Sequence, residues 1–221
     1  MRSSLLATLL SVCALGPTLA SPAATPLVVF ENERVRIVHP RVEPGQASPT
    51  HEHPLRVIVA LADARVEQTI DGGATSVIEL KAGDVRVAPP VRHAVRNVGS
   101  APLDLVEVEV KPVADGRSAG VADASQGDPA HFTRVYEDVA VRVLRFHLGP
   151  HEKAAPHSHG DHVSVNLTDQ QGRVTTRDGE TRDVTRKAGD AVWASPETHS
   201  AQNLSDQTLE VVDIELLTAP R

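Results

Sequence analysis

The chain has 221 residues, a net charge of −7, and hydrophobic residues at 40% of positions, of which few are aromatic. This length and apolar content suit one large or two small domains whose cores are built from aliphatic side chains. Acidic and basic residues are interspersed without a basic stripe, which argues against nucleic acid as a partner.

The N-terminus has the pattern of a secretory signal. Arg2 supplies a positive charge, residues 5–15 form an apolar run too short to anchor in a bilayer, and Ala20 ends a small-residue cleavage site. We therefore expect a signal peptide over residues 1–20 and a mature protein that begins at Ser21, secreted or periplasmic and not attached to a membrane. A short buried helix is the alternative interpretation of this segment.

The single cysteine, Cys13, lies inside the expected signal. Lipidation at Cys13 is a further option, but Val12 is large for that motif and the preceding apolar run is short. After cleavage the mature chain has neither a thiol nor a disulfide, which suits an oxidising compartment. Any metal must then be held by His, Asp, Glu or water.

Residues 27–111 predict strands throughout. Short β-branched runs occupy 35–38 and 57–61, and residues 103–110 alternate with period two, which is typical of a strand with one wet face. Asp71-Gly72-Gly73 predicts a hairpin turn. Many short strands at regular spacing, without a capped helical period, favour a β-sandwich or barrel.

The second half of the chain repeats the first. Residues 51–111 recur at 157–217 with a constant offset of 106 and no gap. A gapless repeat of this kind indicates two tandem copies of one domain, which we place at 27–111 and 133–217. The segment between them, 112–132, is rich in Ala, Gly, Asp and Ser without an apolar period and is interpreted as a linker.

Histidines recur with the repeat and predict two metal sites. Two histidines spaced i, i+2 on a strand point to the same face, and a third, forty residues later, can come from a neighbouring strand. Three imidazoles with open positions suit Fe(II), Mn, Zn, Ni or Cu, so the cofactor expected is a divalent metal ion of unspecified identity. An inherited but empty site is the alternative, although burying unligated imidazoles is costly. The predicted ligands are His51, His53 and His93 in the first copy, and His157, His159 and His199 in the second.

The spacing of these residues resembles the cupin superfamily over nearly the whole mature chain. In the first cupin motif a glycine precedes His-x-His, and in the second Gly-Asp leads to His-x-x-x-Asn. The resemblance implies an all-β bicupin, made of two jelly-roll β-barrels in tandem, each a small cupin_2-like domain. The matching residues are Gly45, His51 and His53; Gly83, Asp84, His93 and Asn97; and Gly189, Asp190, His199 and Asn203.

Two departures from the cupin pattern bear on function. The motif glutamate is absent, since its candidate positions hold Val57 and Ile58 in the first copy and Val163 and Ser164 in the second. His151 stands where the second copy would carry the motif glycine. A neutral three-His set resembles the thiol- and diketone-dioxygenase branch of cupins and argues against oxalate decarboxylases and oxidases.

The two copies differ around their histidines. In the second copy His162 follows His159. If its side chain turns inward, it is a fourth ligand or an acid–base group; if it does not, it is a surface residue. The first copy has Arg56 there, which would repel a cation or clamp an anion if inward, but which we interpret as a solvated strand residue. Asp161 is a further possible ligand, and Trp193 is either pocket wall or core. We expect the second copy to bind metal more tightly and to be the active site, with His162 catalytic.

The sequence therefore predicts an exported, metal-binding bicupin that acts as an Fe(II)- or Mn-dependent oxygenase-type enzyme on a small molecule. The first alternative is a non-catalytic cupin that binds metal or a small ligand outside the cytoplasm. The second is a structural cupin whose first copy has lost its chemistry. The expected partners are a small-molecule substrate or ligand, with a homo-oligomer as an option.

Overall fold

The computed structural model of this chain describes residues 26–71, 73–112, 117–118 and 122–219. The expected signal over residues 1–20 lies outside these residues, as does Gly72 of the predicted hairpin turn. Among the residues described, the chain is almost entirely β-strand, and none of its helices is long and apolar enough to cross a membrane.

Each half of the chain folds into its own set of strands. The first half contains β1 Leu27–Glu31, β2 Val35–His39, β3 Arg41–Val42, β4 His51–His53, β5 Arg56–Ala60, β6 Ala64–Ile70, β7 Thr75–Leu80, β8 Val85–Ala88, β9 Val91–Asn97 and β10 Leu103–Val110. The second half contains β12 Phe132–Glu137, β13 Val141–Leu148, β14 His157–His159, β15 His162–Asn166, β16 Gln170–Thr176, β17 Thr181–Arg186, β18 Ala191–Ala194, β19 Glu197–Asn203 and β20 Leu209–Leu216.

The repeat seen in the sequence is a repeat of structure. Strands β4 to β10 begin and end 106 residues before β14 to β20, one for one. The predicted hairpin turn joins β6 to β7, and its counterpart in the second domain joins β16 to β17, where Gly179 takes a left-handed conformation with φ +87°. Glycine adopts this conformation without the steric cost that a Cβ would bring.

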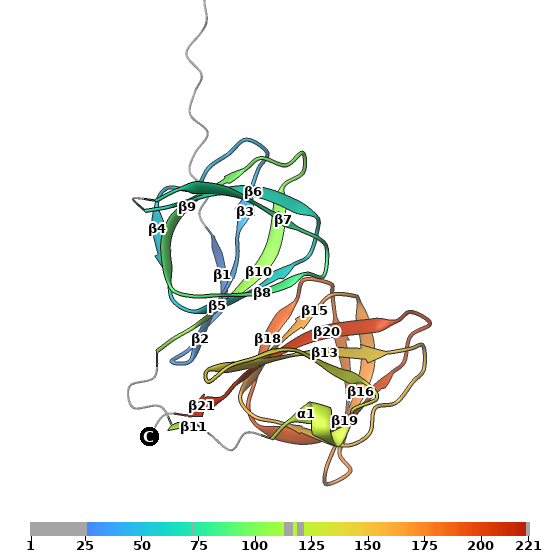
Figure 1. Ribbon diagram of the computed structural model, residues 1–221. Helices are drawn as coiled ribbons and strands as arrows, with labels where there is room; N and C mark the ends of the chain where they lie inside the picture. The colour runs from blue at the N-terminus through green and yellow to red at the C-terminus, as the bar shows by residue number, and fades with distance from the viewer. Residues whose placement is uncertain (1–25, 72, 113–116, 119–121, 220–221) are drawn as a thin grey trace, which may run out of the picture.

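Two antiparallel sheets face each other in each domain and form a jelly roll (Figure 1). The prediction of two all-β jelly-roll domains is confirmed. In the first domain the sheets have the strand orders β1-β2-β10-β5-β8, with β3 paired to β10, and β4-β9-β6-β7. In the second domain the orders are β12-β13-β20-β15-β18 and β14-β19-β16-β17.

The two domains share a hydrophobic core. The sheet that contains β10 packs against the sheet that contains β20, and buried aliphatic side chains from both domains form one cluster. Val106, Val108 and Ile214 in this cluster are fully buried. Two further contacts cross between the domains: Phe30 stacks on Trp193 with ring centroids 6.4 Å apart, and Nη1 of Arg34 lies 2.7 Å from Oδ2 of Asp161. The two jelly rolls are therefore one packed unit.

The alternating strand 103–110 is more buried than the sequence predicts. We expected one of its faces to be wet, but Glu109 is buried and Glu107 is largely covered. The face that carries these two glutamates lines the interior of the first jelly roll, while Val106 and Val108 on the other face join the shared core. Alternation reveals that a strand has two faces, but it does not reveal that the polar one points into a cavity.

The segment 112–132, interpreted as a linker, contains ordered elements. Strand β11 Arg117–Ser118 pairs with β21 Thr218–Ala219, and helix α1 Ala124–Gly127 packs near β14. The side chain of Asp123 accepts a hydrogen bond from Ser125 N at the start of α1. One helical turn is too short to show an apolar period. The N-cap residue Asp123 was the sequence feature that could have indicated this helix.

Candidate metal centres

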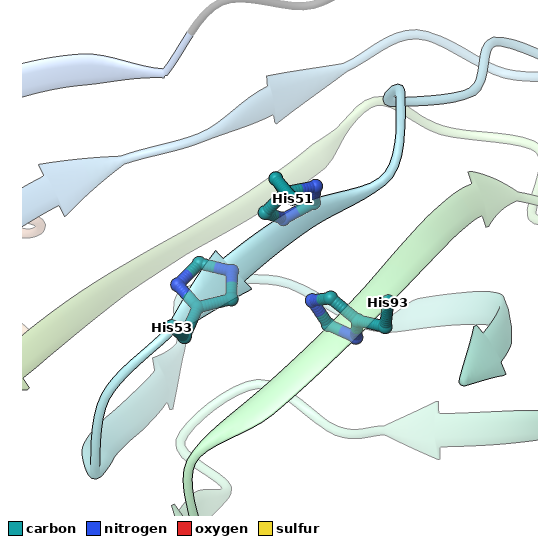
Figure 2. A group of neighbouring side chains, drawn as sticks. All are labelled: His51, His53 and His93. Atoms are coloured by element: carbon teal, nitrogen blue, oxygen red, sulfur yellow. The ribbon is translucent and has the colours of Figure 1, made fainter. Parts of the chain in front are cut away.

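Three histidines converge in the first domain. His51 and His53 lie two residues apart on β4, and His93 lies directly opposite His51 on β9. Their ring centroids are 4.7–5.2 Å apart, and one ligand nitrogen from each lies within 4.8 Å of the other two. Figure 2 shows the three imidazoles grouped between these two strands. The prediction that the three side chains meet is confirmed.

The hydrogen bonds of the first triad leave nitrogens free for a metal ion. Nδ1 of His51 lies 2.7 Å from the carbonyl oxygen of Pro49, and Nδ1 of His53 lies 2.6 Å from Oε1 of Glu109. Since both partners only accept, each Nδ1 donates, and each Nε2 is left with a lone pair. Neither ring nitrogen of His93 has a hydrogen-bond partner among the described residues. Buried nitrogens without partners are what a metal-binding triad requires.

The second domain repeats this arrangement. His157 on β14 pairs in register with His199 on β19, and their Nε2 atoms lie 3.1 Å apart. Nδ1 of His157 donates to the Ala155 carbonyl over 2.8 Å, and Nδ1 of His159 lies 3.0 Å from Oε1 of Glu215. One ligand nitrogen from each of the three histidines lies within 4.8 Å of the others. Both triads therefore fit a divalent ion by donor type and by convergence.

Burial sets the protonation of these clusters. It lowers the pKa of His93 to about 3, with a smaller effect from the charge of Arg56. It also lowers the pKa of His199 to about 3, together with the neighbouring histidines. Both rings are therefore neutral near pH 7, the form that binds metal. Burial also opposes the charged form of His159, but the hydrogen bond to Glu215 and the nearby charges of Asp213 and Glu197 together outweigh it and raise the pKa of that ring.

Two carboxylates that the sequence pattern did not single out orient these histidines. Glu109 and Glu215 occupy equivalent places on β10 and β20, and each also accepts from an arginine: Nη1 of Arg36 lies 2.9 Å from Glu109, and Nη1 of Arg142 lies 2.8 Å from Glu215. Burial would raise the pKa of Glu109, but the hydrogen bonds from His53 and Arg36 outweigh it and lower that pKa. The recurrence of both glutamates at the 106-residue offset was the signal that could have found them.

The position of the missing motif glutamate is occupied by an apolar side chain. On β5, Ile58 lines the interior of the first domain, whereas Val57 is buried in the shared core. Ile58 lies opposite Glu107 and Arg56 opposite Glu109 on the neighbouring strand β10. The carboxylates near the first triad thus come from β10 rather than from β5.

Arg56 and His162, which are equivalent in the repeat, both lie inside their domains. Arg56 is only 3% exposed and lines the cavity beside the triad, so its interpretation as a solvated residue was wrong. His162 is also buried, stacks on His159 with ring centroids 4.5 Å apart, and holds its Nδ1 2.8 Å from the Gly160 carbonyl oxygen. This excludes the surface alternative for His162.

The remaining candidates have other roles. Asp161 pairs with Arg34 across the domain interface and is not part of the histidine cluster. Trp193 both lines the cavity of the second domain and packs against the shared core. His151 has φ +58° where the first copy has Gly45 at φ +77°, so the motif position keeps its left-handed backbone without glycine.

The space beside the two triads differs greatly. The cavity of the first domain has a volume of about 780 Å³, and that of the second about 170 Å³. Phe132 and Phe146 fill the second, with their ring centroids 4.7 and 6.0 Å from that of His157. At the equivalent places the first domain has Pro26 and Pro40, which line the larger cavity. Replacement of two phenylalanines by prolines thus accounts for much of the difference.

Comparison with known proteins agrees with this architecture. Residues 38–109 match the family model of the Cupin domain. No curated protein matches the chain. Similar solved structures include AerE from Microcystis aeruginosa, with TM-score 0.59 and 16% identity over 89% of this chain and 98% of that one.

Two further solved structures have the same fold at low identity. Oxalate decarboxylase from Bacillus subtilis, described with Mn(II) centres, has TM-score 0.58 and 13% identity over 87% of this chain and 72% of that one. A variant of salicylate 1,2-dioxygenase from Pseudoaminobacter salicylatoxidans, in complex with gentisate, has TM-score 0.58 and 12% identity over 87% and 73%. The first domain is thus similar to the Cupin domain family, and the two tandem jelly rolls have the same fold as these solved structures.

Proposed function

We propose that this protein is a metal-dependent enzyme of the oxygenase type that acts on a small molecule in its first domain. The observation that carries this proposal is the placement of His51, His53 and His93 at the wall of a cavity of about 780 Å³. A cavity of this size is in the range that encloses small-molecule ligands. The solved dioxygenase and decarboxylase structures with the same fold support the choice of class.

The protein's own groups prepare the first site. Glu109 and the Pro49 carbonyl fix the rings of His53 and His51 through their Nδ1 atoms, so that Nε2 is presented to the ion. Aliphatic side chains cover much of the cavity wall and limit access of water. A divalent ion held there would leave open positions and would supply Lewis-acid or redox chemistry.

The second domain favours metal binding without a substrate. Its cavity of about 170 Å³ is partly filled by Phe132 and Phe146, and His162 adds a fourth imidazole beside the triad. We expected the second copy to be the active site. We now propose instead that it binds a metal ion but no substrate. A proton-handling role for His162 stays a prediction, and its contact with His159 is what supports it.

We also propose that the protein is exported. The support is the charge, apolar run and cleavage pattern of residues 1–20, together with a mature sequence free of cysteine. N-terminal sequencing of protein from its native source tests this, with Ser21 as the expected first residue. Recovery of the chain with Met1 intact from a cytosolic fraction would contradict the proposal.

The metal content of the protein tests whether each histidine triad binds an ion. Untagged protein should contain about two divalent ions per chain, one per triad. His93→Ala and His159→Ala should each remove one of them, whereas His147→Ala, a change at an exposed histidine on β13, should remove none. Unchanged metal content in both triad variants would refute the assignment of the ligands.

Open coordination positions are a second measurable requirement. Protein loaded with Fe(II) under nitrogen should bind nitric oxide and give the EPR signal of a ferrous nitrosyl. His93→Ala should reduce the signal more than His199→Ala, because the first domain has the space beside its ion. Retention of metal with no nitric oxide signal would contradict the oxygenase-type function and favour the non-catalytic alternative.

A further inference from the structure

We propose that the substrate of the first domain is an organic anion with an apolar body, and that Arg56 binds its anionic group. This inference rests on the proposed function, because it names the class of molecule that occupies the same cavity. Three observations support it: the position of the Arg56 guanidinium, the buried charges around it, and the apolar wall of the cavity beyond it.

Arg56 is a buried cation with an incomplete set of partners. Its side chain is 3% exposed, its Nε lies 3.4 Å from Oε1 of Glu107, and its Nη1 has no hydrogen-bond partner within the described part of the chain. Burial of a charged group costs free energy when its hydrogen bonds are incomplete. A ligand that accepts the missing hydrogen bond reduces this cost. Since Arg56 lines the cavity together with the triad, a ligand in the cavity can reach it.

The charge balance around Arg56 also favours an anion. The two arginines and two glutamates that contact one another here, Arg36, Arg56, Glu107 and Glu109, cancel in formal charge. A divalent ion on the neutral triad then adds two positive charges in a largely buried space. A carboxylate or similar group would offset part of this excess and would match the planar guanidinium fork of Arg56.

The rest of the cavity is suited to an apolar body. Its wall includes Ile58, Val66, Ile78, Leu80, Leu103 and Leu105, contributed by both sheets of the domain. Burial of a hydrocarbon or aromatic group against such a wall is favourable in proportion to the area removed from water. A small inorganic anion would leave most of this surface in contact with water.

The second domain provides an internal comparison. His162 replaces Arg56, Ser164 replaces Ile58, and Phe146 replaces Pro40. The second domain therefore has no guanidinium at the place of Arg56 and has a much smaller cavity, although it keeps the triad. Both features of the proposed anion site are specific to the first domain.

A matched pair of probes tests this inference. Calorimetry on the full-length protein loaded with Zn²⁺, which does not turn over by redox chemistry, should show that 3-phenylpropionate binds about tenfold or more tightly than 3-phenyl-1-propanol. Arg56→Met should remove most of that preference and leave the affinity for the alcohol unchanged. Arg86→Met serves as the control, since Arg86 lines the same cavity but donates to the Glu79 carbonyl.

The outcomes separate this inference from the proposed function. Equal affinity of both probes for the native protein overturns the anion preference while leaving a ligand-binding cavity, and this comparison needs no variant that must fold. An anion preference that survives in Arg56→Met removes Arg56 from the site. Failure of both probes to bind a Zn²⁺-loaded protein refutes the substrate cavity of the proposed function and this inference with it.

Discussion

Nδ1 of His53 lies 2.6 Å from Oε1 of Glu109, inside the first jelly roll. The carboxylate accepts the Nδ1 proton, which fixes the tautomer of the ring and directs Nε2 toward the other histidines. The equivalent pair in the second domain, His159 and Glu215, keeps the same contact at 3.0 Å. Because the pair recurs in both domains, we infer that each centre uses a carboxylate to orient this histidine.

Glu109→Gln should weaken metal binding in the first domain by about 10–100-fold, the range for loss of a carboxylate that orients a ligating histidine. The amide keeps the shape of the side chain but loses its charge, so it supports His53 less well. Competition for Zn²⁺ with a chromophoric chelator measures the change. Glu79→Gln, on an exposed part of β7, is the control and should have no effect. An affinity equal to that of the native protein would show that Glu109 does not serve the metal centre.

His131 predicts a pH dependence of stability. Burial opposes its charged form, but hydrogen bonds to Asp128 and Glu152 outweigh burial and raise its pKa above the ordinary value of 6.5. A raised pKa in the folded state stabilises the protein fully below pH 6.5, and this stabilisation is lost as the pH rises through the folded-state pKa.

His131→Gln should therefore lower the melting temperature more at pH 5.5 than at pH 9. The measurement is thermal unfolding of metal-free native and variant proteins across this pH range. His147→Gln, at an exposed position, is the control. A destabilisation by His131→Gln of the same size at both pH values would exclude a charged His131 as its cause.

Ile214→Ala should destabilise both domains together. Ile214 on β20 is fully buried in the core that the two domains share, and truncation of such a side chain costs about 2–5 kcal/mol. Because the core is continuous, we expect one unfolding transition. Chemical denaturation followed by the fluorescence of Trp193, which stacks on Phe30 of the other domain, reports on the interface.

The matched control for Ile214→Ala is Val139→Ala, since Val139 is 87% exposed. The free energy of unfolding should change there by no more than about 0.5 kcal/mol. Two separate transitions in the native protein, of which Ile214→Ala shifts one alone, would contradict the shared core as the source of cooperativity.

The repeat and the histidines were within reach of sequence reasoning. A constant offset carries every strand boundary from β4 to β10 onto β14 to β20, so the spacing that brings His51 and His53 near His93 must do the same in the second copy. Strand alternation sufficed to place two histidines on one face. The local pattern thus fixed both the fold class and the triads.

The surroundings of the triads were beyond the reach of that reasoning. Alternation marks two faces of a strand, but it cannot distinguish solvent from a polar cavity, and so Glu109 and Arg56 were expected at the surface. The contrast in volume between the domains depends on Phe132 and Phe146, which lie on β12 and β13, strands that carry none of the triad histidines. Their position against His157 follows from how the two sheets close, which is a tertiary property.

The two centres should differ in metal affinity, and the second should be the tighter. Arg56 places a buried cation in the first cavity, where it disfavours a divalent ion, whereas His162 at the equivalent place is an additional imidazole beside the second triad. Titration with a competing chelator should resolve two affinities that differ by about tenfold or more. His199→Ala should abolish the tighter one, and Arg56→Met should strengthen the weaker one. If His93→Ala removes the tighter site instead, the charge of Arg56 does not govern the difference between the domains.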